Sequence, residues 1–385
     1  MKKCSSIFAQ MLRLIPRYEF QKAVSRHRAE RHSKGFSSWT QFVALLFGQL
    51  SGQDGLRGIE TGMAAQKQKL YHLGARAAKR STLSYANAHR SHEVFESVFE
   101  TMLAKVISKA PGHKFRFKND LHSFDATTID LCLSLHDWAK FRKTKGGIKI
   151  HLKLNHAGYL PEFISVSTAN RHEVKELPKL PLKAGDVIVF DRGFTDYEQY
   201  ATYCREDIYF ITRLKKNARY RVVERRDVSK HKHISSDQII EFTGFYSAKK
   251  CPLRLRRIRV KDPQTGKYIE LLTNQMSWSA KTVAAVYKDR WQIEIFFKTM
   301  KQNLKIKSFL GTSKNAIMSQ IWVAMIAYLL LSYMKFLSVH GWTINSLMKV
   351  LPTLLFSRRD LWKWLNEPFG GLPPPDPGSL QYELI

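Results

Sequence analysis

The stretch YKDRWQIEIFFKTMK at residues 287–301 constrains the fold more than any other part of this sequence. Four of its side chains stand at offsets of three, seven and fourteen from the first, which a helix of 3.6 residues per turn brings to one face. These four are Tyr287, Arg290, Glu294 and Lys301. The opposite face carries Ile293, Phe296, Phe297 and Met300, so we expect it to pack on a core. One carboxylate among three polar or cationic groups indicates the wall of a site, with an ordinary solvated face as the alternative.

The charge of the chain indicates its partner. Its 385 residues hold 63 Lys and Arg against 32 Asp and Glu, a net charge of +31 that is spread over the whole length. A field of this sign attracts polyanions, and nucleic acid is the usual partner of a basic, well-folded chain. A chain that is basic only for solubility is the alternative.

Cysteine usage and hydropathy narrow the class of protein. The four cysteines lie far apart with no Cys-x-x-Cys pair, which argues against a zinc finger or a disulfide framework and fits the reducing cytoplasm. The N-terminal apolar run is broken by Gln10 and Arg13, so no signal peptide is expected. The run from Ile321 to Met334 is short for a membrane span of roughly 20 residues and predicts a buried helix.

Three regions differ in their patterning. Residues 1–112 show helical periodicity and two basic clusters, at 26–34 and 76–80, and we predict a helical DNA-binding domain there. Residues 113–340 alternate strands with helices and predict a mixed α/β domain, with a β-rich insertion at 216–275. Residues 341–385 predict a helical region and then a Pro- and Gly-rich tail from Pro368.

Three acids are the candidate catalytic residues. Asp125 lies within a strand pattern, Asp191 follows the apolar run 187–190, and Glu294 approaches from the amphipathic helix. Ligands bind α/β sheets beyond the carboxyl ends of their strands, and clustered carboxylates repel unless a cation neutralises them. Oxygen ligands favour Mg²⁺, with Mn²⁺ as a substitute, and two such ions can drive phosphodiester displacement. A cap, a turn or a salt bridge is the alternative for each isolated acid. Asp130, five residues after Asp125, would face the other side of a continuous strand, and Asp196 is interpreted as a helix cap.

In the order Asp125, Asp191, β-rich insertion, then Y-x-x-R-x-x-x-E with a Lys seven residues later, the chain resembles the DDE transposases of bacterial insertion sequences. More narrowly, it resembles the group with the Tyr-Arg-Glu-Lys signature. FDATTI around Asp125 and VFDRGF around Asp191 match the first two acids of that family. The resemblance covers roughly residues 115–335, and the first 110 residues also look like an N-terminal domain of some members.

That resemblance implies an RNase H-like catalytic core with the insertion between the second Asp and the Glu. It implies cut-and-paste transposition, with hydrolytic nicking at the ends of the element and strand transfer into target DNA. The expected partners are the terminal inverted repeats and target DNA, bound by a homodimer in a paired-end complex on the bacterial nucleoid, with no membrane. Asp125, Asp191 and Glu294 would hold the metal ions, and Tyr287, Arg290 and Lys301 would contact DNA.

Four further residues are weaker candidates for DNA contact. Trp291 could stack on an extruded base or belong to the core. Lys149 and Lys153 share one strand face that could follow DNA or be only solvated, and Arg192 could bind a phosphate or pair with Asp191. Two other functions stay open at this point, a catalytically inactive DNA-binding regulator and a structure-selective nuclease that cuts without joining.

Overall fold

The computed structural model describes residues 5–31, 33–132, 137–142, 145–228, 233–262, 266–304, 306 and 310–370. The chain separates into two compact units. The first comprises residues 1–109 together with 318–385, and the second comprises residues 110–317. The sequence placed a boundary near residue 340 instead, so the apolar helix that was expected in the α/β domain belongs for most of its length to the helical unit.

The first unit is helical over the described residues. Its elements are α1 (Ile7–Arg13), α2 (Arg17–Arg26), α3 (Ser38–Leu50), α4 (Leu56–Ala65), α5 (Lys67–Leu70), η1 (Tyr71–Leu73), α6 (Arg80–His89), α7 (Glu93–Ile107), α13 (Ile344–Leu354) and α14 (Leu361–Asn366), joined by α12 (Lys314–Leu337) from residue 318 onward. Helix α3 is buried on all sides, and the Ser37 hydroxyl caps it by accepting from the Thr40 amide. Such a helix can form only the centre of a bundle.

Helix α12 is a core helix of this unit. It is long and apolar enough to cross a membrane, but 89% of its most apolar 18-residue window is buried inside the protein. Its Trp322 packs on Phe99 of α7 at 5.2 Å between ring centroids, and Lys105 of α7 lies over Tyr333 at 4.9 Å. These contacts explain why α12 groups with the N-terminal helices, and they agree with the buried helix expected from the sequence.

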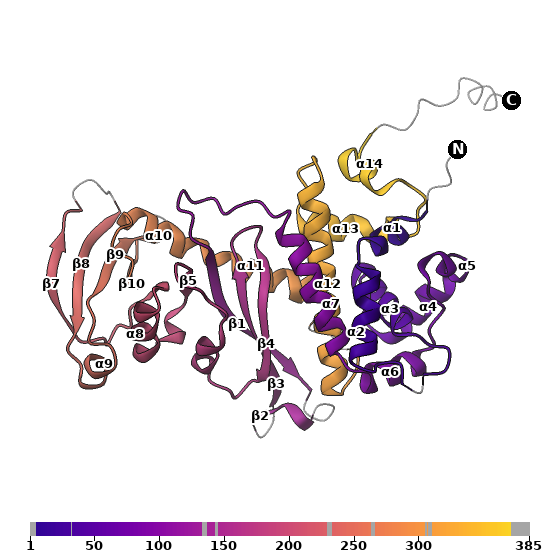
Figure 1. Ribbon diagram of the computed structural model, residues 1–385, viewed down its shortest axis with the longest axis horizontal. Coiled ribbons are helices and arrows are strands. Elements are labelled where there is room, and N and C mark those ends of the chain that lie inside the picture. The colour runs from indigo at the N-terminus through magenta and orange to yellow at the C-terminus, as the bar shows by residue number, and fades with distance from the viewer. Residues whose placement is uncertain are drawn as a thin grey trace. The chain divides into compact units, whose positions relative to one another are not determined.

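The second unit is built on one mixed sheet. In the described residues, ten strands pair in the order β2-β3-β1-β5-β6-β10-β9-β8-β7, and β4 pairs with β3 (Figure 1). The first six strands are β1 (Leu121–Leu131), β2 (Lys140–Arg142), β3 (Lys145–Asn155), β4 (Leu160–Thr168), β5 (Val187–Phe190) and β6 (Tyr209–Arg213). Strand β3 pairs antiparallel with both β1 and β4, whereas β1, β5 and β6 run parallel to one another. Parallel neighbours bring the carboxyl ends of β1, β5 and β6 to one edge.

The β-rich segment extends this sheet and does not form a separate one. Strands β7 (Tyr220–Arg226), β8 (Ile234–Phe242), β9 (Leu255–Lys261) and β10 (Tyr268–Thr273) form an antiparallel meander. Strand β10 then pairs with β6, so the four strands continue the central sheet outward. The helix α9 (Phe245–Lys250) connects β8 and β9.

Each face of the sheet packs against its own helix. Along β5, Ile188 and Phe190 point into a cluster with α8 (Tyr197–Arg205), whereas Val187 and Val189 point into a cluster with α10 (Ala280–Asp289). This alternation is the two-residue period of a strand that is buried on both faces. The second unit also contains the short 3₁₀ segments η2 (Asp137–Ala139), η3 (Glu173–Lys179) and η4 (Arg192–Phe194).

The amphipathic helix expected from Ser279 to about Leu304 is two helices. Helix α10 ends at Asp289, and α11 (Trp291–Gln302) begins directly after Arg290. At the junction the Arg290 amide donates to the Tyr287 carbonyl at 3.2 Å, and the Ile293 amide donates to the Arg290 carbonyl at 3.0 Å. These i to i+3 bonds are those of a 3₁₀ turn, which replaces the α-helical pattern at this point. The single continuous helix predicted from the sequence is therefore wrong at Arg290.

Candidate functional site

The register of two parallel strands places the first two candidate acids side by side. Phe124 of β1 pairs with Phe190 of β5, and Asp125 and Asp191 are the residues that follow. Both lie at the carboxyl edge that β1, β5 and β6 share, although β1 itself continues to Leu131. A ligand site is expected at this edge of an α/β sheet.

Arg290 links the third acid to the first. One terminal nitrogen of its guanidinium lies 3.2 Å from Oδ2 of Asp125, and the other donates to Oε1 of Glu294 at 2.8 Å. The Arg290 side chain is only 13% exposed. Its Nε is buried and has no hydrogen-bond partner in the described part of the chain. The Nε–H group is therefore an unused donor beside two carboxylates.

The other two signature residues also reach the sheet. The Tyr287 hydroxyl donates to Oδ1 of Asp191 at 3.4 Å, and the Lys301 ammonium donates to the Thr128 carbonyl of β1 at 3.0 Å. Burial raises the pKa of Tyr287 to about 12, so its hydroxyl stays protonated at neutral pH. Tyr287, Arg290 and Lys301 thus contact β1 or the residue after β5, and Glu294 is joined to β1 through Arg290. This agrees with the shared face that the offsets predicted, even though the helix is broken between them.

The chemistry of the acids suits a hard divalent cation. Burial raises the pKa of Asp125 to about 6 in spite of the nearby Arg290, which is the behaviour of a carboxylate with too little positive charge around it. Carboxylate oxygens are the ligands that Mg²⁺ and Mn²⁺ prefer. In this conformation Arg290 stands between Asp125 and Glu294, and within the described ranges no three His, Cys, Asp or Glu residues are close enough to hold a metal ion. The donor types therefore fit such an ion, while Arg290 holds Asp125 and Glu294 apart in this conformation.

A basic hollow lies beside Asp191. A cavity of about 420 Å³ is lined by Asp191, Arg192, Gly193, Lys215, Lys216 and Asn217. Arg192, Lys215 and Lys216 are exposed there. The sequence interpretation named Arg192 but missed the two lysines. The sequence feature that could have identified them is a basic doublet just after β6. The parallel pairing of β5 with β6 brings the loop that carries this doublet to the edge that holds Asp191.

Two other predicted residues differ in their surroundings. Trp291 is 59% exposed, which contradicts the alternative that it belongs to the core. Lys153 is 4% exposed, and its ammonium lies 3.1 Å from Glu162 and donates to the Pro181 carbonyl at 2.8 Å. A side chain enclosed in this way has no surface to offer DNA, so its placement contradicts the expected contact.

Lys149 shares the strand face of Lys153 and is also engaged within the protein. Its ammonium pairs with Glu173 of η3 at 2.9 Å, and its side chain is 13% exposed. His151, between the two lysines, is buried and contacts the Ser167 hydroxyl at 2.9 Å. The face that was expected to follow DNA therefore carries structural pairs.

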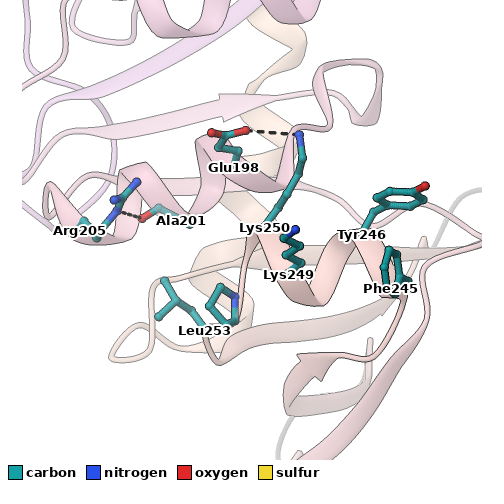
Figure 2. A pocket seen from close by; sticks show the side chains of 9 residues that line it. Glu198, Ala201, Arg205, Phe245, Tyr246, Lys249, Lys250 and Leu253 are labelled. Atoms are coloured by element: carbon teal, nitrogen blue, oxygen red, sulfur yellow. Dashed lines mark hydrogen bonds and ion pairs between the residues drawn. The ribbon is translucent and has the colours of Figure 1, made fainter.

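A second hollow lies between α8 and α9 in the β-rich part of the sheet. Its volume is about 530 Å³, and its lining includes Glu198 and Arg205 of α8 and Lys249 and Lys250 of α9. Figure 2 shows Glu198 reaching Lys250, whereas Arg205 turns back to Ala201 of its own helix. The Lys250 ammonium pairs with Glu198 at 3.3 Å across the hollow. Phe245 and Tyr246 at the start of α9 are 79% and 75% exposed. Adjacent exposed aromatic rings with lysines around them are typical of an interaction surface.

Two protein families match this chain. Residues 117–330 match the family described as transposase DDE domain, which covers more than half of the chain and includes all three candidate acids. Residues 3–76, in the helical unit, match a domain of unknown function, DUF4372.

Curated relatives carry the same description. The chain is 33% identical to a putative transposase of Sinorhizobium fredii over 282 residues, which is 72% of this chain and 78% of the relative. It is 28% identical over 249 residues, 64% of this chain and 65% of the relative, to a probable insertion-sequence transposase of Geobacillus stearothermophilus. A putative insertion-sequence transposase of Synechocystis is 24% identical over 330 residues, 85% of this chain and 91% of the relative. Among solved structures, a piggyBac transposase in a synaptic complex with hairpin DNA shares 12% identity at a TM-score of 0.42, over 97% of this chain and 85% of that one.

Proposed function

Because this chain belongs to the transposase DDE domain family, we propose that Asp125, Asp191 and Glu294 are the residues with which it cuts and joins DNA. The protein is a transposase of an insertion sequence, and transposition is its function. The family implies an enzyme that cleaves or transfers DNA strands, and its members generally use divalent metal ions. The site residues, the choice of Mg²⁺ and the cut-and-paste route are proposals.

One observation carries the assignment of the acids. Asp125 and Asp191 follow a paired position on neighbouring parallel strands, and Arg290 connects Asp125 to Glu294. Three acids from separate parts of the chain therefore gather at one edge of the sheet, where isolated caps or turns would not place them together. Three antiparallel strands followed by two parallel ones also support an RNase H-like core, which the strands β7–β10 extend between the second and third acid.

The three carboxylates would hold Mg²⁺, or Mn²⁺ in its place. When bound, the divalent cations lower the pKa of an attacking water or 3′-hydroxyl and stabilise charge on the leaving oxygen. Tyr287 orients Asp191 through its hydroxyl, and Lys301 fixes α11 to β1. With a cation held by the carboxylates, Arg290 would be free to donate to a phosphate oxygen, and its Nε, which has no partner in the described residues, could take part in that contact.

DNA contacts follow from the exposed cations and aromatic rings. Trp291 stands exposed beside Arg290, where it can stack on a base, and Lys215, Lys216 and Arg192 offer positive charge beside Asp191. In the helical unit a hollow of about 410 Å³ holds Arg57, Lys79 and Arg80 against one acid, Glu60. This excess of positive charge supports a DNA-binding role for residues 1–112, with a homodimer holding two ends of the element.

The decisive experiment uses purified protein and labelled DNA that carries an end of the flanking element. Cleavage is measured with Mg²⁺, with Mn²⁺ and with EDTA, for the wild type and for Asp125→Ala, Asp191→Ala and Glu294→Ala. The matched control is Asp130→Ala, because Asp130 lies on the same strand as Asp125 but is exposed. We expect metal-dependent cleavage at the tip of the element that only the three site variants lose.

The products distinguish the remaining pathways. Joined products with target DNA, with or without a hairpin intermediate, support cut-and-paste transposition. Cleavage without joining indicates a nuclease, and end binding without cleavage in either metal indicates a DNA-binding regulator. Cleavage retained by Glu294→Ala would reject the proposed site.

A further inference from the structure

A buried relay of three side chains connects β1 to the end of α10. The Ser123 hydroxyl lies 2.7 Å from Nε2 of His156, and Nδ1 of His156 lies 2.7 Å from Oδ2 of Asp289. Ser123 stands two residues before Asp125, and Asp289 stands directly before Arg290. The relay therefore joins the strand that carries the first acid to the helix junction that carries Arg290 and leads to Glu294.

The direction of the two hydrogen bonds follows from the chemistry of the groups. An ionised carboxylate can only accept, so Nδ1 of His156 carries the proton that is donated to Asp289. Burial lowers the pKa of His156, which keeps the ring neutral, so Nε2 accepts from the Ser123 hydroxyl. Serine, histidine and aspartate in this order are familiar from hydrolases, but here Ser123 and His156 are at most 1% exposed. No substrate can reach the hydroxyl, so the relay acts within the protein.

Two side chains besides His156 donate hydrogen bonds to the Asp289 carboxylate. Besides His156, the Lys114 ammonium lies 2.5 Å from Oδ1, and the Tyr159 hydroxyl donates to Oδ2 at 3.2 Å. Burial works against ionisation of Asp289, but its bonds to His156 and Lys114 outweigh burial and lower its pKa. The carboxylate thus collects donors from the segment before β1 and from the turn between β3 and β4.

The turn between β3 and β4 is shaped to reach Asp289. Tyr159 has φ of 55°, in the left-handed region that a residue with a side chain rarely adopts. The preceding residue, Gly158, has φ of 69°, and the His156 amide donates to the Leu121 carbonyl of β1 at 2.9 Å. The strained tyrosine lies where its hydroxyl and the His156 ring contact the same carboxylate. Local backbone strain of this kind persists because the surrounding contacts hold the residue in place.

From these contacts we propose that Asp289 is a positioning residue of the transposase site, holding the 3₁₀ junction between α10 and α11 against β1. The junction is the one break in the stretch that carries all four signature residues, and a short 3₁₀ turn inside a helix can act as a hinge. Asp289 is the last residue before the break, and its bonds to Lys114, His156 and Tyr159 hold it in place. His156 and Ser123 connect it to β1. The relay sets where Arg290 and Glu294 lie relative to Asp125. This inference rests on the function proposed for those three residues.

The test compares two variants that each remove one paired carboxylate charge from the same unit; the Asp289 side chain is 3% exposed and that of Glu162 is 16% exposed. Asp289→Asn removes the clamp, whereas Glu162→Gln is the matched control, because Glu162 pairs with the buried His122 and Lys153 and touches neither helix of the junction. Single-turnover cleavage of end DNA by the full chain gives a rate constant and an amplitude, and a titration gives the Kd for the same DNA. Loss of folded protein lowers the amplitude, whereas misplacement of the site lowers the rate constant at full amplitude.

We expect Asp289→Asn to lower the rate constant by about 10- to 100-fold, since misplacement by about 1 Å can have an effect of that size. Amplitude per folded molecule and Kd should change by less than about twofold, as should the rate constant of Glu162→Gln. Ser123→Ala, which leaves the Asp289 carboxylate in place, should give a smaller loss in the same direction. A wild-type rate constant in Asp289→Asn, or an equal loss in Glu162→Gln, would overturn the positioning role. If Glu294→Ala cleaved normally, the proposed function itself would fail; loss in Glu294→Ala with a normal Asp289→Asn would reject the positioning role alone.

Discussion

Asp125 and Asp191 each stand one residue beyond the paired phenylalanines of two parallel strands, so the register of the sheet determines where they meet. Phe124 and Phe190 are both fully buried in the core on the α8 side. A one-residue slip between β1 and β5 would expose one of these rings and turn one acid away from the other. The hydrophobic pattern of the strands thus fixes the geometry of the two carboxylates.

Replacing Arg290 by Ala should lower the cleavage rate by about 100-fold, in the range seen when one preorganised donor to a developing charge is removed. The guanidinium contacts both Asp125 and Glu294, and its Nε, which has no partner in the described residues, is available for a phosphate. Arg290→Lys should recover only part of the loss, because an ammonium cannot bridge two carboxylates in the same planar geometry. Single-turnover cleavage measures both variants.

The control for Arg290 is Lys281→Ala, which removes an exposed cation from the first turn of α10, the helix whose end Arg290 caps, nine residues before Arg290. We expect its cleavage rate to stay within about twofold of the wild type, because single exposed charges contribute little. Equal losses in the two variants would mean that Arg290 acts only through the overall charge of the helix.

Tyr287→Phe should lower the cleavage rate by about fivefold, equivalent to about 1 kcal/mol for a lost hydrogen bond. The effect should be smaller than that of Arg290→Ala because the bond to Asp191 is long, at 3.4 Å. Since burial raises the Tyr287 pKa to about 12, the ratio of variant to wild-type rates should stay constant between pH 7 and 9. A ratio that changes over that range would show that tyrosine ionisation, and not the hydrogen bond alone, matters.

The sequence predicted the elements that have a strong local signal. The apolar run 187–190, the acid that follows it and the four signature offsets each point to one face or one strand end, and the structure has them there. It also predicted the burial of α12, because a run of about 14 apolar residues is too short to span a bilayer. These features depend on residues close together in the chain.

The features that the sequence interpretation missed depend on distant pairings. Nothing local marks the break at Arg290, because the residues around it keep helical periodicity; the break accompanies contacts of Asp289 with Lys114, His156 and Tyr159. Lys153 looked like an exposed strand lysine until β4 supplied Glu162 to pair with it. The unit boundary moved for the same reason, since α12 packs on α7, more than 200 residues earlier in the chain.

Replacing Lys215 and Lys216 together by Ala should weaken DNA binding in a salt-dependent way. Both are exposed in the hollow beside Asp191, where they can reach phosphates. Each phosphate contact contributes about 0.9 to the slope of log K against log salt concentration, so the double variant should lower that slope by about 2. Titrations of end DNA at several salt concentrations give the slope, and Lys183→Ala, an exposed lysine with 82% side-chain exposure, is the control that should leave it unchanged.

Glu162→Gln should destabilise the fold by about 3 kcal/mol, the size of effect seen when one partner of a buried ion pair is removed. Ring nitrogens of His122 lie 3.2 Å from Glu162 and 3.7 Å from Asp186, with Lys153 3.1 Å from Glu162. Burial alone would raise the Glu162 pKa, but His122 and Lys153 outweigh it and lower that pKa to about 2. Burial alone would lower the His122 pKa, but the two carboxylates raise it above 6.5.

The two shifts set the pH window of that prediction. The contribution of Glu162 is complete above its ordinary pKa of 4.5 and is lost as the pH falls toward 2, whereas that of His122 is complete below 6.5 and is lost as the pH rises through its raised pKa. The difference in unfolding free energy between the wild type and Glu162→Gln should therefore be largest between pH 4.5 and 6.5 and shrink on both sides. Urea unfolding followed by circular dichroism across this range measures it. A difference that does not vary with pH would mean that the fold depends on the shape of Glu162 and not on its charge.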